Sequence, residues 1–389
     1  MTISFDVLPL IGEQMSGVGY CQAGLITELL QKHPEYNYTF DFFSFRNHQK
    51  KEERLLSYQT EQVRLNRVCF PGAFYRMIMN FIPFSYSYFF GREAEITHFF
   101  NYLVPPHVFG KTVVTVHDMV IWAFPETVRW KTKVLLKTGL KQSMKRADRI
   151  ITDSYFSKQE IIKYYPRYQE KIRVVPCGVD LKRFYRITDQ AEINRVKDKL
   201  KITGDYFLYV GTIEPRKNLL RLIKGYQLFC KKYPQAPQLV LAGGKGWMNQ
   251  KFYAWIQKVG LEDRLCFTEY VASEDLCALY NGAVSFFFPS YYEGFGIPPL
   301  EAMACAVPVL VSFEASLPEV VGECGVYVNA YDEQSIADGI ERLYTDPSLR
   351  RELSQRGQER AKEFTWEHAA EKLYLVYKEL LDETKNKDT

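Results

Sequence analysis

Hydrophobic and polar positions along the chain repeat with two different spacings. Short apolar runs predict β-strands, and longer stretches with apolar residues every three or four positions predict α-helices. In the first half the predicted strands are residues 4–10, 38–45, 95–99, 112–116, 149–152 and 174–177, and the predicted helices are 19–32 and 130–147. Strands that alternate with helices in this way favour a parallel sheet covered on both faces.

A second series of strands and helices follows residues 178–204, which begin polar and turn-rich and which we interpret as the linker. Its predicted strands are 206–210, 238–242, 265–267, 284–289 and 307–312, and its predicted helices are 219–232, 251–259 and 273–281. A last helical pattern, 366–381, could cross back onto the first domain. We therefore predict two Rossmann-like domains, 1–185 with a C-terminal helix at about 366–385, and 186–365.

The overall composition is that of a soluble globular protein. Of 389 residues, 47% are hydrophobic and 25% are charged, and the apolar runs are shorter than the ~20 residues that a membrane span needs. Residues 1–10 lack the basic start and cleavage site of a signal peptide and read as an opening strand. Eight cysteines are scattered without a C-x-x-C pair, which favours buried reduced thiols and a cytoplasmic protein.

Charge divides the chain unevenly. Residues 1–186 carry 26 Lys and Arg against 17 Asp and Glu, a net charge of +9, whereas residues 187–389 carry 24 against 29, a net charge of −5. A basic first half suggests an anionic surface or acceptor, but no nucleic-acid-binding motif accompanies it. Basic and aromatic residues in 64–90 and in the helix at 129–149 could meet an anionic membrane or a lipid-linked acceptor. Alternatively, the aromatic residues form core and the helix has a solvated face, the commoner arrangement.

The sequence EGFGIPPLE at 293–301 carries the most chemical information. Two acids, Glu293 and Glu301, stand eight positions apart, and the glycines between them allow the backbone to approach a ligand. Pro298 and Pro299 fit the first turn of a helix, and free N–H groups at that helix start suit a diphosphate. One acid can bind sugar hydroxyls while the other holds a ribose, so the segment predicts a site for an anion and a polyol.

Two further loops carry candidate phosphate ligands. In YVGTIEPRKNL, Arg216 and Lys217 follow a strand, where open α/β sheets place their ligands, and could neutralise a leaving diphosphate. The alternative is a solvated pair that caps a helix. In IGEQMSGVGY, Gly17 and Gly19 would let the backbone approach a phosphate, or they form only a tight turn. LVLAGGKGW, with Gly243, and the later Tyr270 and Val271 are weaker candidates for nucleotide contacts.

His117 closes the strand VVTVHD and could donate a hydrogen bond to a sugar hydroxyl, or it is half of a packed His–Asp pair. No acid or cysteine cluster lies near it in sequence, so we do not expect a zinc site. No D-x-D occurs, so the paired carboxylates that hold a metal-bound diphosphate are missing, and Arg216 and Lys217 would have to supply the positive charge. The phosphate loop of ATPases and the G-x-S-x-G of hydrolases are also missing.

The chain resembles the retaining, nucleotide-sugar-dependent glycosyltransferases of family 4. The resemblance rests on four motifs in this order: the glycine loop, the His-Asp pair, GTIEPRKN and the E-x₇-E block. The resemblance implies the GT-B fold, an α/β architecture of two facing Rossmann-like domains with parallel sheets. The GT-x-EPRKN subgroup looks like bacterial mannosyl- or related transferases that build surface polysaccharides. Many relatives carry an arginine after the glycine that here is Gly211, whereas this chain has Thr212, so Arg216 would have to supply that contact.

The resemblance also implies roles for individual residues. Gly17 and Lys217 would hold the diphosphate with help from Arg216, Glu293 would bind the donor sugar, Glu301 would bind the ribose, and His117 would face the reacting sugar. Further donor contacts would come from Gly19, Gly243, Tyr270, Val271, Phe295, Gly296, Ile297 and Leu300. No obvious nucleophile stands out, so we expect same-face transfer with retention. We expect no cofactor and no divalent metal.

The predicted reaction moves a hexose from a nucleotide-sugar onto a saccharide or lipid-linked saccharide acceptor. GDP-mannose is the first choice of donor, ahead of UDP-glucose, UDP-galactose and dTDP-rhamnose. We expect a cytoplasmic enzyme, with peripheral contact to the inner face of the plasma membrane as a further hypothesis. Two alternatives stay open: a nucleotide-sugar 2-epimerase of similar fold, which would rearrange its donor without an acceptor, and a non-catalytic protein that only binds nucleotide-sugars.

Overall fold

The computed structural model describes residues 1–12, 15–79, 82, 84–244, 246, 250–261 and 263–385. The chain forms two compact units. The N-terminal unit comprises Met1–Gly178 and the segment that starts at Trp366, and the C-terminal unit comprises Val179–Thr365. Some residues of the predicted segments lie outside the described ones: Glu13, Gln14, Asn80, Phe81, Pro83, Lys245 and Trp247.

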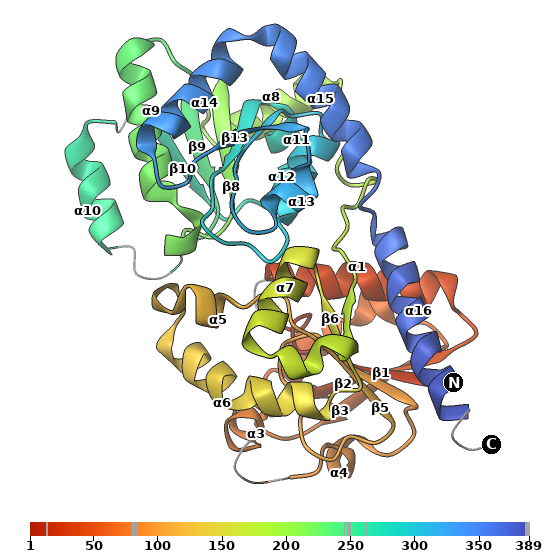
Figure 1. Cartoon of the computed structure of the whole chain (residues 1–389). Helices are drawn as coiled ribbons and strands as arrows, with labels where there is room; N and C mark the ends of the chain where they lie inside the picture. Colours follow the sequence, from red (N-terminus) through yellow and green to blue (C-terminus); the bar gives the residue numbers. More distant parts are fainter. Residues whose placement is uncertain are drawn as a thin grey trace. The chain divides into compact units, whose positions relative to one another are not determined.

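The N-terminal unit is built on a seven-stranded parallel sheet in the order β3-β2-β1-β4-β5-β6-β7. The strands are β1 (Thr2–Asp6), β2 (Asn37–Phe43), β3 (Val63–Val68), β4 (Ile96–Phe99), β5 (Lys111–Thr115), β6 (Arg149–Thr152) and β7 (Ile172–Val174). The helices are α1 (Gly17–Lys32), α2 (His48–Glu53), α3 (Gly72–Ile78), α4 (Tyr86–Phe90), α5 (Val120–Ala123), α6 (Trp130–Arg146), α7 (Tyr155–Tyr164) and α16 (Trp366–Lys385) (Figure 1).

The C-terminal unit has a six-stranded parallel sheet in the order β10-β9-β8-β11-β12-β13 (Figure 1). Its strands are β8 (Tyr206–Val210), β9 (Gln238–Ala242), β10 (Leu265–Glu269), β11 (Ala283–Phe288), β12 (Val309–Ser312) and β13 (Gly325–Val328). Its helices are α8 (Gln190–Lys199), α9 (Leu219–Lys232), α10 (Gln250–Val259), α11 (Leu276–Asn281), α12 (Ile297–Ala304), α13 (Leu317–Val321), α14 (Glu333–Thr345) and α15 (Pro347–Ala361).

Both sheets contain a position where the strand order reverses. In the N-terminal unit β1 lies between β2 and β4, and in the C-terminal unit β8 lies between β9 and β11. Loops that leave these strands at their carboxyl ends diverge toward opposite faces of the sheet, which opens space for a ligand. The predicted glycine loop follows β1, and GTIEPRKN follows β8, so the fold puts both at such a position.

Two segments differ from the sequence prediction. The expected linker contains helix α8, whose buried residues are only Ile193 and Val196, so its apolar pattern is too sparse to be recognised. Residues 64–90 form strand β3 and helices α3 and α4, and Tyr75, Tyr86 and Phe90 belong to the buried core. Core formation is therefore the correct interpretation for these three aromatic residues, whereas Phe74, Met77 and Tyr88 are exposed.

Helix α16 packs within the N-terminal unit, against α1. The Tyr377 hydroxyl lies 2.7 Å from Nδ1 of the buried His98, and Lys32 forms an ion pair of 2.6 Å with Glu367. Gly24 on α1 has no room for a side chain, because a Cβ there would come within 2.2 Å of the Trp366 ring. The C-terminal segment is thus part of the first unit. Among the described residues, no helix is both long and apolar enough to cross a membrane.

Candidate active site

The Arg-Lys turn after β8 is held by its own backbone and by two neighbouring loops. Pro215–Lys217 form a 3-10 turn, and Asn218 ends it with φ of 61°, a left-handed conformation that asparagine tolerates. The buried Asn218 side-chain amide donates hydrogen bonds to the carbonyl oxygens of Pro289 (2.9 Å) and Ala330 (2.7 Å). The turn is therefore fastened to the loops that follow β11 and β13.

This turn brings two cations onto the predicted sugar-binding acid. The Lys217 ammonium lies 2.7 and 2.9 Å from the two carboxylate oxygens of Glu293, and Arg216 Nη1 lies 2.7 Å from Glu293 Oε2. Arg216 also donates to the Tyr292 carbonyl (3.0 Å) and pairs with Glu214 at 2.9 Å. Glu214, which the sequence analysis did not single out, makes the group two cations and two carboxylates, with no net charge.

Burial and charge act against each other in this cluster. Burial raises the pKa of Glu293, but Arg216 and Lys217 outweigh it and bring the pKa below its usual value. Burial also lowers the pKa of the Lys217 ammonium, and the neighbouring Arg216 lowers it further. Buried charges of this kind persist only when they are paired and hydrogen-bonded. The cluster is therefore preassembled, and each cation is held by a carboxylate that an incoming anion would have to replace.

The loop of Glu293 leads directly into helix α12. Gly296 adopts φ of 113°, which only glycine accepts readily, and the buried Ser316 hydroxyl donates to the carbonyl oxygens of Glu293 (3.0 Å) and Phe295 (2.7 Å). Pro298 and Pro299 stand in the first turn of α12 as predicted. Because prolines have no N–H, the donors that this helix start offers an anion are fewer than the sequence analysis expected.

Glu301 lies farther along helix α12. Its Oε2 accepts a hydrogen bond of 2.8 Å from the Tyr280 hydroxyl. Burial raises the pKa of this carboxyl to about 7, which the Tyr280 hydrogen bond only partly offsets. The group thus changes charge near neutral pH, unlike Glu293.

The other residues predicted to contact the donor differ in how far their side chains are exposed to solvent. The side chains of Val271, Phe295 and Leu300 are 6%, 4% and 0% exposed, so they pack in the core and only their backbone atoms could meet a ligand. Tyr270 is 53% exposed. Gly243 has φ of 153°, and a Cβ there would lie 2.0 Å from the Gly211 carbonyl oxygen, so the loops after β8 and β9 touch.

In the N-terminal unit, helix α1 starts two residues earlier than predicted. Gly17 is its first residue, and a Cβ on Gly17 would meet nothing within 4 Å. The Ser16 side chain caps the helix by accepting a hydrogen bond of 3.3 Å from the Gly19 N–H. The Gly19 amide is therefore already engaged, and a Cβ there would lie 2.9 Å from the Pro9 carbonyl oxygen. Of the two glycines, Gly17 is the more open to a ligand.

His117 is buried and bonded at both ring nitrogens. Its Nδ1 lies 2.7 Å from Asp153 Oδ2, and its Nε2 lies 2.8 Å from the Phe100 carbonyl oxygen. Burial alone would lower the pKa of His117, but the Asp153 carboxylate outweighs it and raises the pKa to about 10. The imidazolium thus donates to two protein acceptors, so a bond to a sugar would have to replace one of them. The acid partner is Asp153, not the adjacent Asp118 that the sequence suggested.

The fold also gathers side chains that are far apart in sequence near His117. Cys21, Asp153 and Cys177 are buried, and their ligand atoms lie within 4.8 Å of one another, with the two sulfur atoms 3.6 Å apart. Two thiols and a carboxylate at this spacing are a set that a thiophilic cation could use. The sequence shows no acid or cysteine cluster around His117, because the three residues come from α1 and from the segments that follow β6 and β7.

Two doubly wound units, with paired cations and carboxylates at the carboxyl end of the second sheet, are the arrangement expected of the glycosyltransferase class with the GT-B fold. Consistently, the profile described as Glycosyl transferases group 1 matches residues 190–360, and that of Glycosyltransferase Family 4 matches residues 25–183. The chain belongs to this family and is a hexosyltransferase.

Curated relatives agree with this assignment. The chain is 36% identical to O-antigen chain mannosyltransferase B of Escherichia coli over 70% of this chain and 71% of that protein. It is 34% identical to the serotype-specific mannosyltransferase WbdA of Escherichia coli, over 62% of this chain but only 30% of that longer protein. The fold matches sucrose-phosphate synthase from Thermosynechococcus elongatus with a TM-score of 0.74 at 21% identity, covering 98% and 99% of the two chains.

Proposed function

We propose that this protein transfers mannose from GDP-mannose, with retention of configuration, to a saccharide or lipid-linked saccharide acceptor in surface polysaccharide synthesis. The observation that carries the proposal is the contact of Arg216 and Lys217 with Glu293 at the carboxyl end of the second sheet. The choice of mannose is supported by the relatives, two of which are O-antigen or serotype mannosyltransferases of Escherichia coli.

In the proposed donor complex, the ion pairs of the free protein are exchanged. The donor diphosphate takes over the contacts of Lys217 and Arg216, and the carboxylate of Glu293 becomes able to accept hydrogen bonds from sugar hydroxyls. Glu293 loses its ion pairs with Arg216 and Lys217 in this exchange. The free-energy cost is offset because the diphosphate brings negative charge to the same two cations. Glu214 keeps Arg216 in place during the exchange, since it pairs with the other side of the guanidinium.

The proposed chemical step takes place on one face of the sugar. The acceptor hydroxyl oxygen forms a bond to the anomeric carbon on the side from which the diphosphate leaves, the bond from that carbon to the diphosphate oxygen breaks, and the hydroxyl proton passes to the diphosphate. Arg216 and Lys217 stabilise the negative charge that develops on the leaving group. Because these side chains carry the positive charge, the proposal needs neither a cofactor nor a divalent cation.

A donor screen tests this proposal. We expect GDP-mannose to raise the melting temperature more than UDP-glucose, UDP-galactose or dTDP-rhamnose, because a ligand that binds only the folded state stabilises it. With a mannose-terminated acceptor, the anomeric proton of the product should report the configuration of the donor. Stronger stabilisation by another nucleotide-sugar would show that GDP-mannose is the wrong donor. A product with inverted configuration would contradict the retaining mechanism.

The epimerase alternative is separated by incubation of the donor alone. A transferase should give slow hydrolysis at most, whereas an epimerase should convert the sugar to its 2-epimer without an acceptor. Tight donor binding without transfer to any acceptor would instead favour a non-catalytic protein that binds nucleotide-sugars.

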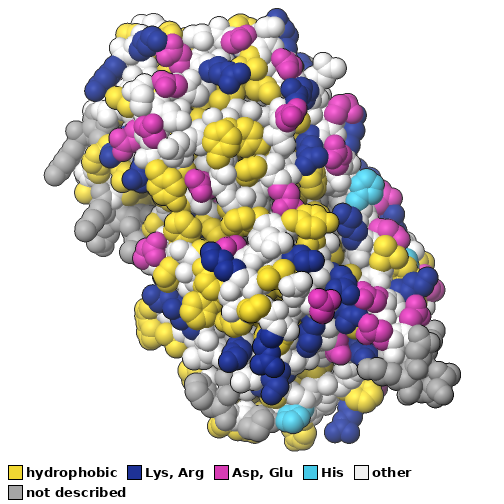
Figure 2. Space-filling view, viewed as in Figure 1, with side chains coloured by type: hydrophobic (Ala, Val, Ile, Leu, Met, Phe, Trp, Pro, Cys, Tyr) yellow, Lys and Arg dark blue, Asp and Glu magenta, His cyan; other side chains and the backbone are white. Residues whose placement is uncertain are grey.

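We further propose that helix α6 contacts an anionic membrane on the cytoplasmic side. Its exposed face carries Lys131, Lys137, Lys141 and Lys145, together with Trp130 (68% exposed) and Val134 (51% exposed). Figure 2 shows Lys and Arg side chains gathered on one face of the N-terminal unit. Such a helix binds anionic lipids through charge and through shallow insertion of its apolar residues. Flotation with anionic liposomes should succeed at low salt and fail at high salt, whereas no flotation at low salt would contradict the contact.

A further inference from the structure

We propose that Asp6 and Arg76 form a clamp in the N-terminal unit that binds neighbouring hydroxyl groups of an uncharged acceptor sugar. The proposal rests on the function given above, because it assigns the acceptor side of the same reaction. The clamp lies in a partly open pocket that is lined by the ends of β1 and β2, by α3 and by the segment after β4.

The pocket lies where the strand order of the first sheet reverses. Asp6 ends β1, Phe42 and Phe43 end β2, Asn101 follows β4, and Arg76 reaches in from α3. Such a position is where open α/β sheets take their ligands. The pocket therefore corresponds in topology to the Arg216, Lys217 and Glu293 site of the other unit.

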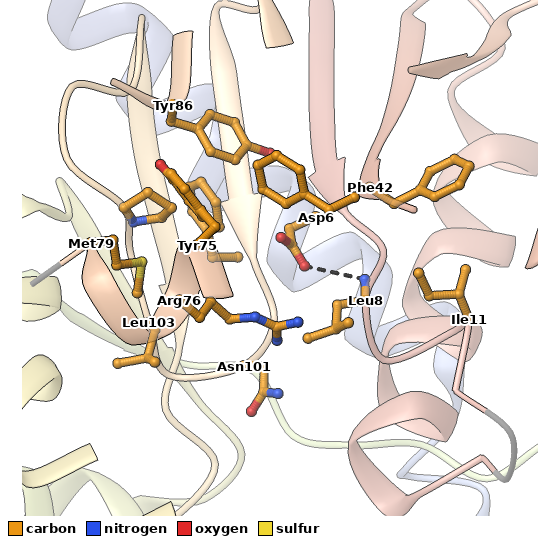
Figure 3. Close-up of a pocket in the computed structure, with 13 residues that line it drawn as sticks. Asp6, Leu8, Ile11, Phe42, Tyr75, Arg76, Met79, Tyr86, Asn101 and Leu103 are labelled. Atoms are coloured by element: carbon orange, nitrogen blue, oxygen red, sulfur yellow. Dashed lines mark hydrogen bonds between the residues drawn. The ribbon is translucent and has the colours of Figure 1, made fainter. Parts of the chain in front are cut away.

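Asp6 differs from a second carboxylate beside it. Asp41 is its partner in register on β2, and it accepts hydrogen bonds from Ser4 (2.5 Å), Asn66 (2.9 Å) and Tyr86 (3.0 Å). Among the described residues, the Asp6 carboxylate accepts a hydrogen bond only from the Leu8 N–H, at 3.1 Å on Oδ1 (Figure 3). Burial nevertheless raises the pKa of Asp6. One of two adjacent carboxylates is thus saturated, and the other has unused acceptor capacity facing a pocket.

Arg76 is the matching donor. Its Nε makes a long hydrogen bond of 3.4 Å to the Gly72 carbonyl, and among the described residues no other bond or direct ion pair holds its guanidinium. Figure 3 shows this guanidinium extending toward Leu8, with Asp6 above it and Asn101 below it in this view. Asp6 acts on Arg76 through space, as its charge opposes the effect of burial on the pKa of the guanidinium. Opposite charges that face each other without direct contact leave room for a group that bonds to both.

The chemistry of the clamp selects the ligand. A hydroxyl both donates and accepts, so two neighbouring hydroxyls can accept from Arg76 and donate to Asp6 at once. The half-buried Phe43 and Leu8 side chains provide an apolar wall for the C–H face of a sugar ring, whereas Phe42, Tyr75 and Tyr86 are at most 3% exposed and belong to the core. A phosphate would bring a second negative charge next to Asp6, which is unfavourable in a half-buried site. An uncharged pyranoside fits both the charges and the wall.

The test compares two clamp variants with two matched controls. Asp6→Asn and Arg76→Met should each raise the acceptor KM at least tenfold, while donor KM, donor hydrolysis and the affinity for GDP change less than twofold. Asp41→Asn makes the same chemical change on the neighbouring strand, and Arg64→Met removes an exposed arginine paired with Glu93. Both controls should leave the acceptor KM within twofold of the wild type.

Direct binding separates this proposal from the proposed reaction. Octyl α-mannopyranoside, observed by saturation-transfer NMR without donor, should bind the wild type and Asp41→Asn and lose its signal with Asp6→Asn and Arg76→Met. Unchanged binding and an unchanged acceptor KM in both clamp variants would overturn the clamp even if transfer of mannose is confirmed.

Inorganic phosphate provides the competing outcome. If phosphate displaces the mannoside from the wild type and this displacement is lost in Arg76→Met, the pocket is an anion site and the assignment of an uncharged sugar is wrong. If phosphate has no effect at concentrations where the mannoside is displaced by mannose oligosaccharides, the assignment stands. Failure of the wild type to use any mannosyl donor, with mannoside binding intact, would contradict the proposed function and not the clamp.

Discussion

The two units place charged side chains at the same topological position but pair them differently. After β8, Lys217 and Arg216 are in direct contact with Glu293 and Glu214, and every carboxylate has a cation at 2.9 Å or less. In the N-terminal unit, Asp6 at the end of β1 faces Arg76 of α3 without an ion pair. A preassembled cluster suits an anionic ligand that replaces one carboxylate, whereas a separated pair suits a neutral ligand that bridges both charges. The same fold can thus prepare two chemically different sites by the distance between opposite charges.

The strongest test of this comparison removes a partner of the paired cluster. Lys217→Ala and Glu293→Ala should each lower kcat/KM by about 100-fold or more, as the loss of one transition-state contact often does. Steady-state kinetics with varied donor and acceptor measure the effect. Lys224→Ala is the control, because Lys224 lies on α9 and pairs with Glu333 at 2.8 Å outside the cluster. Near-normal turnover in either cluster variant removes that residue from the mechanism.

A more conservative substitution tests whether the geometry of the Arg216 guanidinium matters in addition to its charge. Arg216→Lys should lower kcat/KM by about tenfold, because an ammonium cannot reach Glu214, Glu293 and the Tyr292 carbonyl together as the guanidinium does. Arg221→Lys is the matched change, since Arg221 donates to the Tyr291 hydroxyl. Equal rates for Arg216→Lys and the wild type would show that only the charge at this position counts.

The titration of Glu301 gives an effect of a few-fold. With a pKa of about 7 in the free protein, the carboxyl loses its proton as pH rises through neutrality and becomes a pure acceptor for ribose hydroxyls. We expect calorimetry to show tighter GDP binding at about pH 8 than at about pH 6, by roughly three- to tenfold. Glu301→Gln should bind GDP with an affinity that changes little over this range, and the same pH dependence in that variant would contradict the ribose role.

The same titration acts on stability with the opposite sign. Because the pKa of Glu301 is raised above its unfolded value, the folded state holds the proton more tightly, so this contribution to the free energy of unfolding is lost as pH rises through about 7. Denaturant unfolding of the ligand-free protein at several pH values should therefore show a smaller decline for Glu301→Gln than for the wild type.

The smallest expected effect is that of metal removal. Since Arg216 and Lys217 carry the positive charge in the proposed mechanism, treatment with EDTA should change the transfer rate by less than about twofold. Parallel assays with added manganese provide the comparison. Complete loss of transfer in EDTA, restored by manganese, would contradict the proposed use of side-chain cations.

Most regular elements could be read from the sequence, but with uneven accuracy. The bounds of β8, α9 and β9 agree with the prediction, because dense apolar runs end at glycine, proline or charged residues. Strand β3 has no clear apolar pattern, because it lies at the edge of its sheet, contains two arginines and is only partly buried. Local pattern identifies elements that bury many side chains and fails for those that bury few.

The site shows the same division. That Lys217 and Glu293 belong to one site followed from two motifs with the composition that phosphates and hydroxyls require. Other parts of the site depend on side chains that the fold brings together. These are the contact of Glu214 with Arg216, the contact of Asp153 with His117, and the clamp of Asp6 and Arg76.

By itself, the sequence determined the alternation of strands and helices, the chemical character of the loops that we predict to bind the donor, and the family, because each depends on residues close together along the chain. Only the tertiary structure decided which charges touch and which stay apart. Burial and the distance between opposite charges set the pKa values and the unused bonding capacity of a side chain, and both depend on how the strands are ordered in each sheet.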